Sequence, residues 1–387
     1  MDSSIALPLL LITFGAMLTP MLARTLALPL AVVEIAYGVM IGPHGLGLAD
    51  PAVPFVHTLA DLGFAFFLFL TGLEVDVPLL RQRGRRAMAG LILLSLVSFV
   101  LSGGVAARLG WGMWTALALG ATSVPLLVSV LRELDLVRSP TGASLIAGAA
   151  VGEVVTVALM SVMSVVSSAG GPLEALVGLG RLSGLILVLW IGTGVLRLAL
   201  WWRPEPFLRM VASHDPNEIG VRAGFGVMFA MIAVALLTGV EAVMGAFLGG
   251  LMVGGVVHDR GALEDKLGSM AWGFFVPVFF VHVGMRLELD ARLITEDAGW
   301  LLGMAGVMLG VKLLPQLLLL TRGASLRAVA AGALLYAAPL TLVIAVMDLA
   351  QRVGQVDTHT ESAVIAAGML ASLAFPSLAR RLLATAA

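Results

Sequence analysis

Apolar runs of membrane-spanning length fill this chain almost from end to end. An α-helix needs about 20 mostly apolar residues to cross the hydrocarbon core of a bilayer, where its backbone groups must hydrogen-bond within the segment. Read in this way, the sequence predicts thirteen spans, near residues 5–23, 27–43, 57–79, 87–107, 113–131, 141–168, 176–200, 218–238, 241–257, 270–287, 299–320, 327–350 and 361–379. We therefore expect an all-α polytopic membrane protein that lies in a lipid bilayer.

The composition excludes several classes of function. Hydrophobic residues make up 59% of the chain and charged residues 12%, whereas soluble domains carry about 25% charge. The chain has no cysteine, so disulfides, thiol nucleophiles and Cys-ligated metals are excluded. The net charge of −1 argues against a nucleic-acid partner. No motif of an enzyme or of a resident cofactor or metal is present, and we expect none of these.

Basic residues are distributed unevenly between the connections. Seventeen of the 23 Lys and Arg residues fall after odd-numbered spans and five at even-numbered connections, while Lys312 lies within a span. Because cytoplasmic loops collect Lys and Arg, this asymmetry supports thirteen spans. It predicts an N-terminus outside the cell and a C-terminus in the cytoplasm.

Two ionisable residues lie inside apolar spans, Glu153 in the sixth and Lys312 in the eleventh. A charge at mid-membrane costs at least about 2.5 to 3.5 kcal/mol and is tolerated mainly where it has a partner, water or a function. One carboxylate and one ammonium therefore predict an ion or proton site. Near the end of the tenth span, Arg286 is expected to anchor the helix or to pair with Glu288.

Proline interrupts the middle of two further spans. The fifth span carries Thr122, Ser123 and Pro125, and the twelfth carries Pro339 and Thr341. Proline removes an amide donor and clashes with the preceding turn, so each helix is expected to break or kink there. The two spans are seven apart, which gives them opposite orientations. Matched breaks in inverted repeats predict two crossing discontinuous helices around a midplane binding site, although simple proline kinks would give the same local pattern.

Four strings resemble a known family. Residues 28–48, 67–87, 243–255 and 274–290 are similar to signature stretches of the sodium/hydrogen exchanger fold in bacterial cation:proton antiporters. The resemblance is greatest to the second cation/proton antiporter family, which includes the potassium-efflux antiporters. It implies one exchanger-like domain over 1–387 in the bacterial inner membrane. It also implies a homodimer, in which core helices, roughly 87–168 and 299–381, move like an elevator against a dimerisation scaffold.

The resemblance assigns a role to Glu153. The family usually has Asp at this position, preceded by Asp, Asn or Gln, whereas this chain has Gly152 before Glu153. Glu153 would bind either a proton or Na+ or K+, and Gly152 would leave space for its longer side chain. A single carboxylate beside a neutral residue is associated in the family with electroneutral exchange. Thr122 and Ser123 would supply hydroxyl ligands, or would bond to carbonyls of their own helix.

Lys312 aligns with a basic residue of the related antiporters. It would either form a salt bridge with Glu153 that a cation breaks, or neutralise the negative helix ends at the crossing. The second role is favoured.

Other functions stay open. The family commonly has a Pro-Arg-Gly-Glu-like string in the twelfth span, and this chain keeps only Pro339 of it. That loss suggests, as an alternative, a proton-coupled exporter of an organic compound on the same fold; a gated channel or a sensor is a third reading. No Walker motif and no G-x-G-x-x-G unit between a strand and a helix is present. We therefore expect transport driven by an ion gradient and no C-terminal nucleotide-binding domain.

Overall fold

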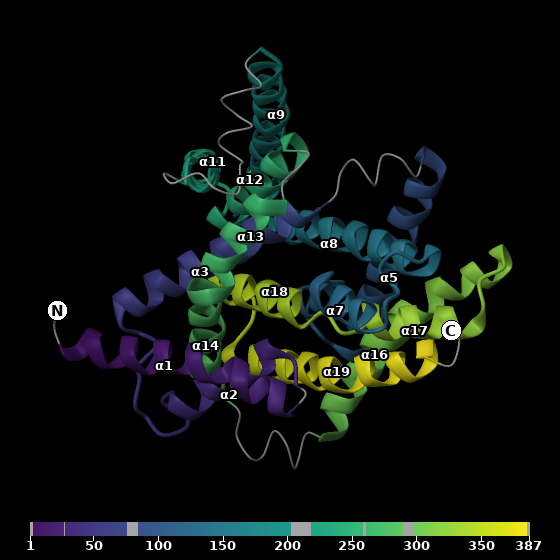
Figure 1. Ribbon diagram of the computed structural model, residues 1–387, viewed down its shortest axis with the longest axis horizontal. Coiled ribbons are helices and arrows are strands. Elements are labelled where there is room, and N and C mark those ends of the chain that lie inside the picture. Colours follow the sequence, from purple (N-terminus) through teal and green to yellow (C-terminus); the bar gives the residue numbers. More distant parts are fainter. Residues whose placement is uncertain are drawn as a thin grey trace. The chain divides into compact units, whose positions relative to one another are not determined.

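A computed structural model describes residues 3–26, 28–75, 84–202, 218–257, 261–288 and 298–384. Within these ranges the chain is helical and contains no β-strand (Figure 1). In chain order the helices are α1 (Ser3–Leu26), α2 (Leu30–Ile41), α3 (Pro54–Glu74), α5 (Arg85–Leu109), α6 (Met113–Gly120), α7 (Pro125–Glu133), α8 (Pro140–Ser167), α9 (Pro172–Trp202), α11 (Ile219–Leu237), α12 (Ala242–Val256), α13 (Gly261–Met270), a π-helical turn η1 (Ala271–Phe275), α14 (Val276–Arg286), α16 (Ala298–Gln316), a 3-10 segment η2 (Leu317–Arg322), α17 (Leu326–Tyr336), α18 (Leu340–Arg352) and α19 (Thr358–Ala384).

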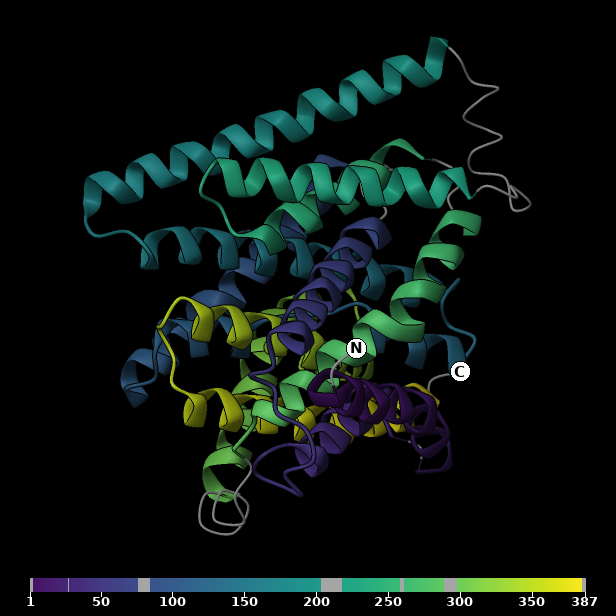
Figure 2. The ribbon, with the colours of Figure 1, turned by 90° about the vertical axis from the view of Figure 1, so that its left-hand side faces the viewer.

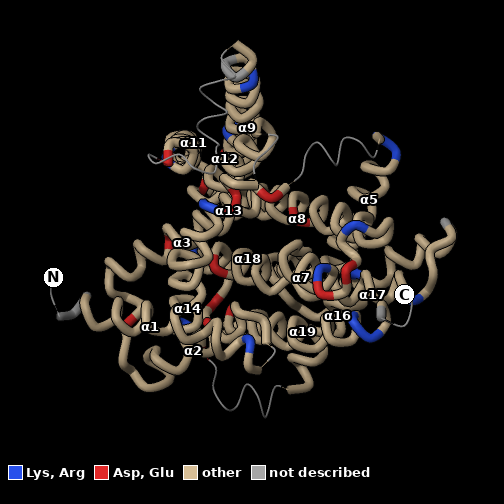
Figure 3. The backbone as a smooth tube through the Cα atoms, in the orientation of Figure 1, with Lys and Arg blue, Asp and Glu red and all other residues tan. Residues whose placement is uncertain are grey.

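Each predicted span overlaps one or more helices within the described residues, and residues 76–79 of the third span lie outside them. Eleven helical segments of the described chain are long and apolar enough to cross a membrane, and α2 and α12 are shorter apolar helices. The prediction of an all-α polytopic membrane protein is therefore confirmed. Most charged residues lie near helix ends or in connections (Figure 3). Six of the basic residues in the charge count lie outside the described residues, namely Arg81, Arg83, Arg203, Arg209, Arg260 and Arg292.

The helices form two compact units. Unit 1 comprises Met1–Ala16, Asp50–Gln82 and Ser161–His282, and unit 2 comprises Met17–Ala49, Arg83–Met160 and Val283–Ala387. Both proline-interrupted spans therefore belong to unit 2. The assignment of a moving core to 87–168 and 299–381 stays a prediction.

Aromatic stacking holds α3 within unit 1. Phe64 stacks on Phe279 with ring centroids 4.8 Å apart, and Phe66 stacks on Phe275 at 4.9 Å. All four rings belong to the run of large apolar residues that the sequence places in the third and tenth spans. Because offset stacking adds about 0.5 to 1.5 kcal/mol per pair beyond burial, these pairs fix α3 against η1 and α14.

Glycines bring α3 and α12 into close contact. A Cβ atom at Gly72 would lie 2.2 Å from the carbonyl oxygen of Phe247, and one at Gly250 would lie 1.9 Å from that of Phe69. No side chain fits at either distance. Small residues of this kind allow helix backbones to approach in membranes, where packing rather than the hydrophobic effect drives association.

Helix α9 exposes most of its apolar surface. It runs uninterrupted for 31 residues (Figure 2), and large side chains such as Leu176, Trp190 and Ile191 are exposed. Its contact with the rest of unit 1 includes a hydrogen bond of 2.7 Å from Arg197 Nη2 to the carbonyl oxygen of Gly255, near the end of α12. An apolar, exposed surface of this kind suits a helix that faces lipid or another protein in the bilayer.

A buried ionic network joins α14, α18 and α19 within unit 2. Arg286 Nη1 lies 2.8 Å from Asp348 Oδ1, and Arg286 Nη2 lies 3.3 Å from Glu361 Oε2. Arg352 Nε binds the second oxygen of Asp348 at 2.7 Å. Arg286 therefore pairs with these two carboxylates, which come from helices that pack around its guanidinium. A pair with Glu288 was one of its two expected roles, and anchoring of the helix was the other.

A candidate cation and proton site at two crossing helix breaks

The first helix break separates α6 from α7. Helix α6 ends at Gly120 and α7 begins at Pro125. Proline suits the first position of a helix, since its missing N–H group would have no intrahelical partner there. Thr122 and Ser123 lie between the two half-helices, and each is 4% exposed. Their hydroxyls are thus buried beside backbone that is not helical.

The second break separates α17 from α18. Helix α17 ends at Tyr336, and α18 begins directly after Pro339. The hydroxyl of Ser123 lies 2.9 Å from that of Thr341 in the first turn of α18. The two breaks therefore lie against each other, so the predicted pair of crossing discontinuous helices is present in unit 2.

Lys312 reaches the first break from α16. Its side chain is 3% exposed, and its Nζ donates hydrogen bonds to the carbonyl oxygen of Gly120 and, at 2.7 Å, to Thr122 Oγ1. The Nζ atom also lies 5.5 Å from the ring centroid of Phe99, within the range of a cation–π interaction. Gly120 is the last residue of α6, where the helix dipole is negative. These contacts suit charge compensation at that end.

Glu153 lies on α8 next to the same break. Its side chain is 2% exposed. The preceding residue, Gly152, packs directly on Thr122, because a Cβ atom at Gly152 would lie 2.9 Å from Thr122 Cβ. Thr122 thus takes the space that Gly152 was expected to leave for the Glu153 side chain. A larger side chain at position 152 would therefore collide with Thr122.

Tyr336 connects the second break to α8 through a hydrogen bond. Its hydroxyl donates a 2.9 Å hydrogen bond to the carbonyl oxygen of Leu145. Gly148 makes room for this contact, since a Cβ atom there would lie 2.2 Å from Tyr336 Oη. Neither Tyr336 nor Gly148 was predicted to have a role. The sequence held one weak signal for Tyr336. It is one of just two tyrosines in the chain, and it lies three residues before a helix-breaking proline.

An apolar cluster packs around the half-helix α7, which follows the first break. Leu127 and Leu131 of α7 are fully buried against residues of α8, α17 and α19, namely Leu145, Ala149, Ala331, Leu335, Ala379 and Leu383. The half-helices are therefore fixed by ordinary core packing on one side. Their polar ends meet Lys312, Thr341 and α8 on the other side.

Known proteins resemble this chain over most of its length. A family model described as "Sodium/hydrogen exchanger, transmembrane" matches residues 10–384. A Na+/H+ antiporter of Enterococcus hirae is 28% identical, with 76% of this chain and 75% of the relative covered. The solved structure of the sodium proton antiporter MjNhaP1 from Methanocaldococcus jannaschii has a TM-score of 0.62 and 18% identity, with 99% and 96% covered.

Several relatives are longer than this chain. The chain spans 62% of the length of a Bacillus subtilis relative to which it is 26% identical. It spans 37% of cation/H+ antiporter 17 of Arabidopsis thaliana, to which it is 30% identical over 73% of its own length. The match to MjNhaP1 concerns the fold, and the family model covers nearly every residue that the structure describes. The chain therefore belongs to the sodium/hydrogen exchanger transmembrane family.

Proposed function

We propose that this protein is a secondary active antiporter that exchanges a monovalent cation, Na+ or K+, for protons. The observation that carries the proposal is the buried carboxylate of Glu153 on a helix that touches the crossing of two broken helices. Hydroxyl oxygens of Thr122 and Ser123 lie at that crossing, and Lys312 supplies a fixed positive charge. Half-helix ends and oxygen ligands at mid-membrane suit a dehydrated monovalent cation.

Exchange follows from competition for one carboxylate. Glu153 holds either a proton or a cation, so each ion displaces the other. With one proton exchanged for one cation, the loaded site carries the same charge in both directions, and transport is electroneutral. Lys312 stays protonated in this cycle, since its ammonium balances the negative end of α6 at Gly120. If Lys312 instead released a proton on cation binding, two protons would move per cation and transport would be electrogenic.

Alternating access would come from movement of the predicted core, residues 87–168 and 299–381. Both helix breaks, Glu153 and Lys312 lie in these ranges, so the site can move as one body in an elevator-type cycle. The exposed apolar helix α9 suits a scaffold that forms a homodimer. In the cell the protein would lie in the inner membrane with its N-terminus outside, as the positive charges predict.

The proposal is tested in everted membrane vesicles that carry a pH-sensitive fluorescent dye. Addition of Na+, K+ or Li+ should dissipate an imposed pH gradient in vesicles with the wild-type protein. Vesicles with Glu153→Gln, expressed to the same level, should give no response. Glu133→Gln serves as the matched control, because Glu133 is an exposed carboxylate paired with Arg380 and should leave the response unchanged.

Two outcomes would contradict parts of the proposal. A full response by Glu153→Gln would exclude Glu153 as the shared carboxylate. No response of the wild-type protein to any of the three cations would favour the exporter of an organic compound. Electroneutrality is tested separately in proteoliposomes, where a valinomycin-imposed membrane potential should leave the rate of Na+/H+ exchange unchanged.

A further inference from the structure

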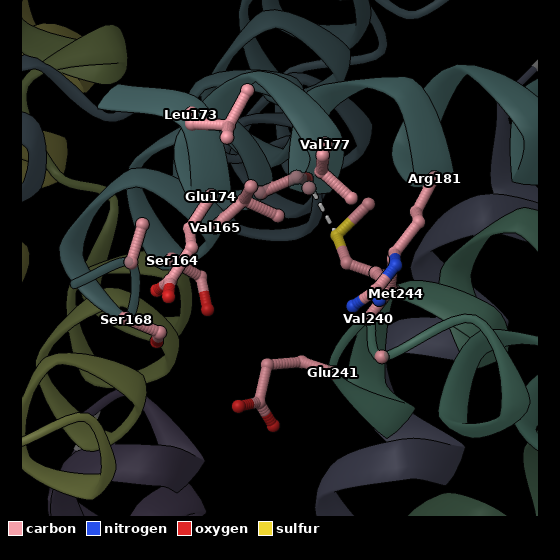
Figure 4. A pocket seen from close by; sticks show the side chains of 14 residues that line it. Ser164, Val165, Ser168, Leu173, Glu174, Val177, Arg181, Val240, Glu241 and Met244 are labelled. Carbon is pink, nitrogen blue, oxygen red and sulfur yellow. Dashed lines mark hydrogen bonds between the residues drawn. The ribbon is translucent and has the colours of Figure 1, made fainter. Parts of the chain in front are cut away.

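Unit 1 contains a cavity remote in sequence from both helix breaks. It has a volume of about 500 Å³ and lies between the end of α8, the start of α9 and the connection from α11 to α12 (Figure 4). Pockets that bind small molecules typically have volumes of about 300 to 1,000 Å³ and combine apolar walls with a few convergent polar groups. This cavity meets both conditions.

The charged groups of the cavity have an excess of negative charge. Glu174 and Glu241 contribute two carboxylates, and Arg181 contributes one guanidinium. Oε2 of Glu174 accepts a 2.7 Å hydrogen bond from the backbone N–H of Gly170. The carboxylate of Glu241 makes no capping hydrogen bond to α12 and points into the open cavity (Figure 4). A cation is therefore the ligand that the charges favour.

Buried hydroxyls and apolar side chains complete the wall. Ser164 is 4% exposed and lines the cavity, and its hydroxyl has no hydrogen-bond partner among the described residues. Val165, Val240 and Met244 form apolar parts of the same wall. This hydroxyl is open to the cavity, where a ligand or water can hydrogen-bond with it.

We propose that this cavity binds a small organic cation, an ammonium ion that carries an apolar body. The ammonium group would lie between Glu241 and Glu174 and would donate to the hydroxyl oxygen of Ser164. The apolar body would lie on Val240 and Met244. A bare alkali-metal ion would fill a small part of the volume and leave the apolar wall without a partner. An anion would gain from Arg181 but would be repelled by the two carboxylates.

The absence of cysteine from the chain allows a direct test. Ser164→Cys places a single thiol in the cavity wall of the purified full-length protein. Its rate of modification is measured with a cationic reagent, 2-aminoethyl methanethiosulfonate, and with the anionic 2-sulfonatoethyl methanethiosulfonate. Both rates are normalised to those of free mercaptoethanol. Ser168→Cys, a more exposed position that lines the same cavity, is the second variant if Ser164→Cys does not fold.

The negative cavity should favour the cationic reagent by about tenfold. Adding Glu241→Gln to the single-cysteine protein should remove most of this preference, whereas Asp265→Asn, which removes an exposed carboxylate of α13 outside the cavity, should leave it intact. Equal rates for the two reagents, or a preference that survives Glu241→Gln together with Glu174→Gln, would overturn the assignment of a cation site.

Protection against modification tests the ligand class. Hexylammonium chloride should slow modification of the thiol at concentrations at which hexanol, sodium hexanesulfonate and NaCl do not. Protection by hexanol to the same extent would show that the wall binds apolar molecules without regard to charge. Protection by NaCl alone would assign the cavity to hydrated metal cations. Both results overturn the proposal, and neither depends on whether Glu153 carries the transported ion.

Discussion

The hydroxyl groups of Ser123 and Thr341 lie 2.9 Å apart, although the residues are separated by 218 positions in the sequence. This hydrogen bond joins the break between α6 and α7 to the break between α17 and α18. Ser123 lies two residues before Pro125, the first residue of α7. Thr341 lies two residues after Pro339, which immediately precedes α18. Non-helical backbone in a membrane is tolerated where it is buried in protein or lines a cavity, and here each break provides the polar surroundings of the other.

We predict that Ser123 and Thr341 act on cation affinity as one unit. Ser123→Ala and Thr341→Val should each raise the half-saturating cation concentration for exchange. The double variant should be about as impaired as the worse single variant, with a coupling of about 1 kcal/mol. The measurement is a double-mutant cycle of exchange rate against cation concentration in proteoliposomes. Strictly additive effects would show that the two hydroxyls act separately.

Gly148 and Tyr336 should behave as a matched pair. Gly148→Ala places a methyl group 2.2 Å from Tyr336 Oη, so it should lower both exchange activity and the melting temperature. Tyr336→Phe removes the obstructing hydroxyl, and the double variant should recover part of the stability that Gly148→Ala loses. Melting of the detergent-purified proteins, followed by tryptophan fluorescence, measures this effect.

The control for this pair is Gly303→Ala in α16. Nothing lies within 4 Å of a Cβ atom at Gly303, and alanine is a better helix former than glycine by about 1 kcal/mol. This variant should be as stable as the wild-type protein or slightly more so. If Tyr336→Phe gave no recovery in the Gly148→Ala background, the collision with the hydroxyl would not be the cause of the loss.

Most of the fold could be predicted from sequence patterns, because the bilayer imposes strong constraints on each membrane-spanning segment. Span length, proline position and the cost of buried charge are physical limits that act on each segment alone. They were enough to predict the apolar spans and the interruptions at Pro125 and Pro339. They also singled out Glu153 and Lys312, since an ionisable residue inside an apolar span stands out without any knowledge of its neighbours.

Such local patterns could not predict the contacts between segments that are distant in sequence. The packing of Gly152 on Thr122 depends on how closely α8 approaches α6, and no local signal encodes that distance. The same holds for the hydroxyl of Tyr336 on α8. For Arg286 the sequence predicted either an anchoring role or a pair with its neighbour Glu288, but the fold brings Asp348 and Glu361 to it from other helices. Pairing by proximity in sequence fails when helices 60 or more residues apart share a core.

Removal of the Lys312 ammonium should reduce stability. Lys312→Met keeps an apolar chain of similar length but leaves the carbonyl oxygen of Gly120 without this donor. Loss of one partner of a buried hydrogen bond costs about 1 to 3 kcal/mol, so the melting temperature in detergent should fall. If Lys312 compensates charge and carries no proton, the residual exchange of the folded fraction should stay insensitive to membrane potential. Exchange that is potential-dependent in the wild type and becomes independent in Lys312→Met would instead identify Lys312 as a proton carrier.

The network around Asp348 should contribute more to stability than the exposed ion pair between Glu133 and Arg380. Asp348 is 1% exposed at its side chain and binds both Arg286 and Arg352. Asp348→Asn removes the buried carboxylate that pairs with both guanidinium groups, and disruption of a buried pair in this way costs about 3 kcal/mol or more. Glu133→Gln breaks a pair whose side chains are 52% and 40% exposed, which is worth at most about 1 kcal/mol. Urea or thermal unfolding of the purified variants should therefore rank Asp348→Asn well below Glu133→Gln. Equal losses would show that the three helices α14, α18 and α19 are held by apolar packing alone.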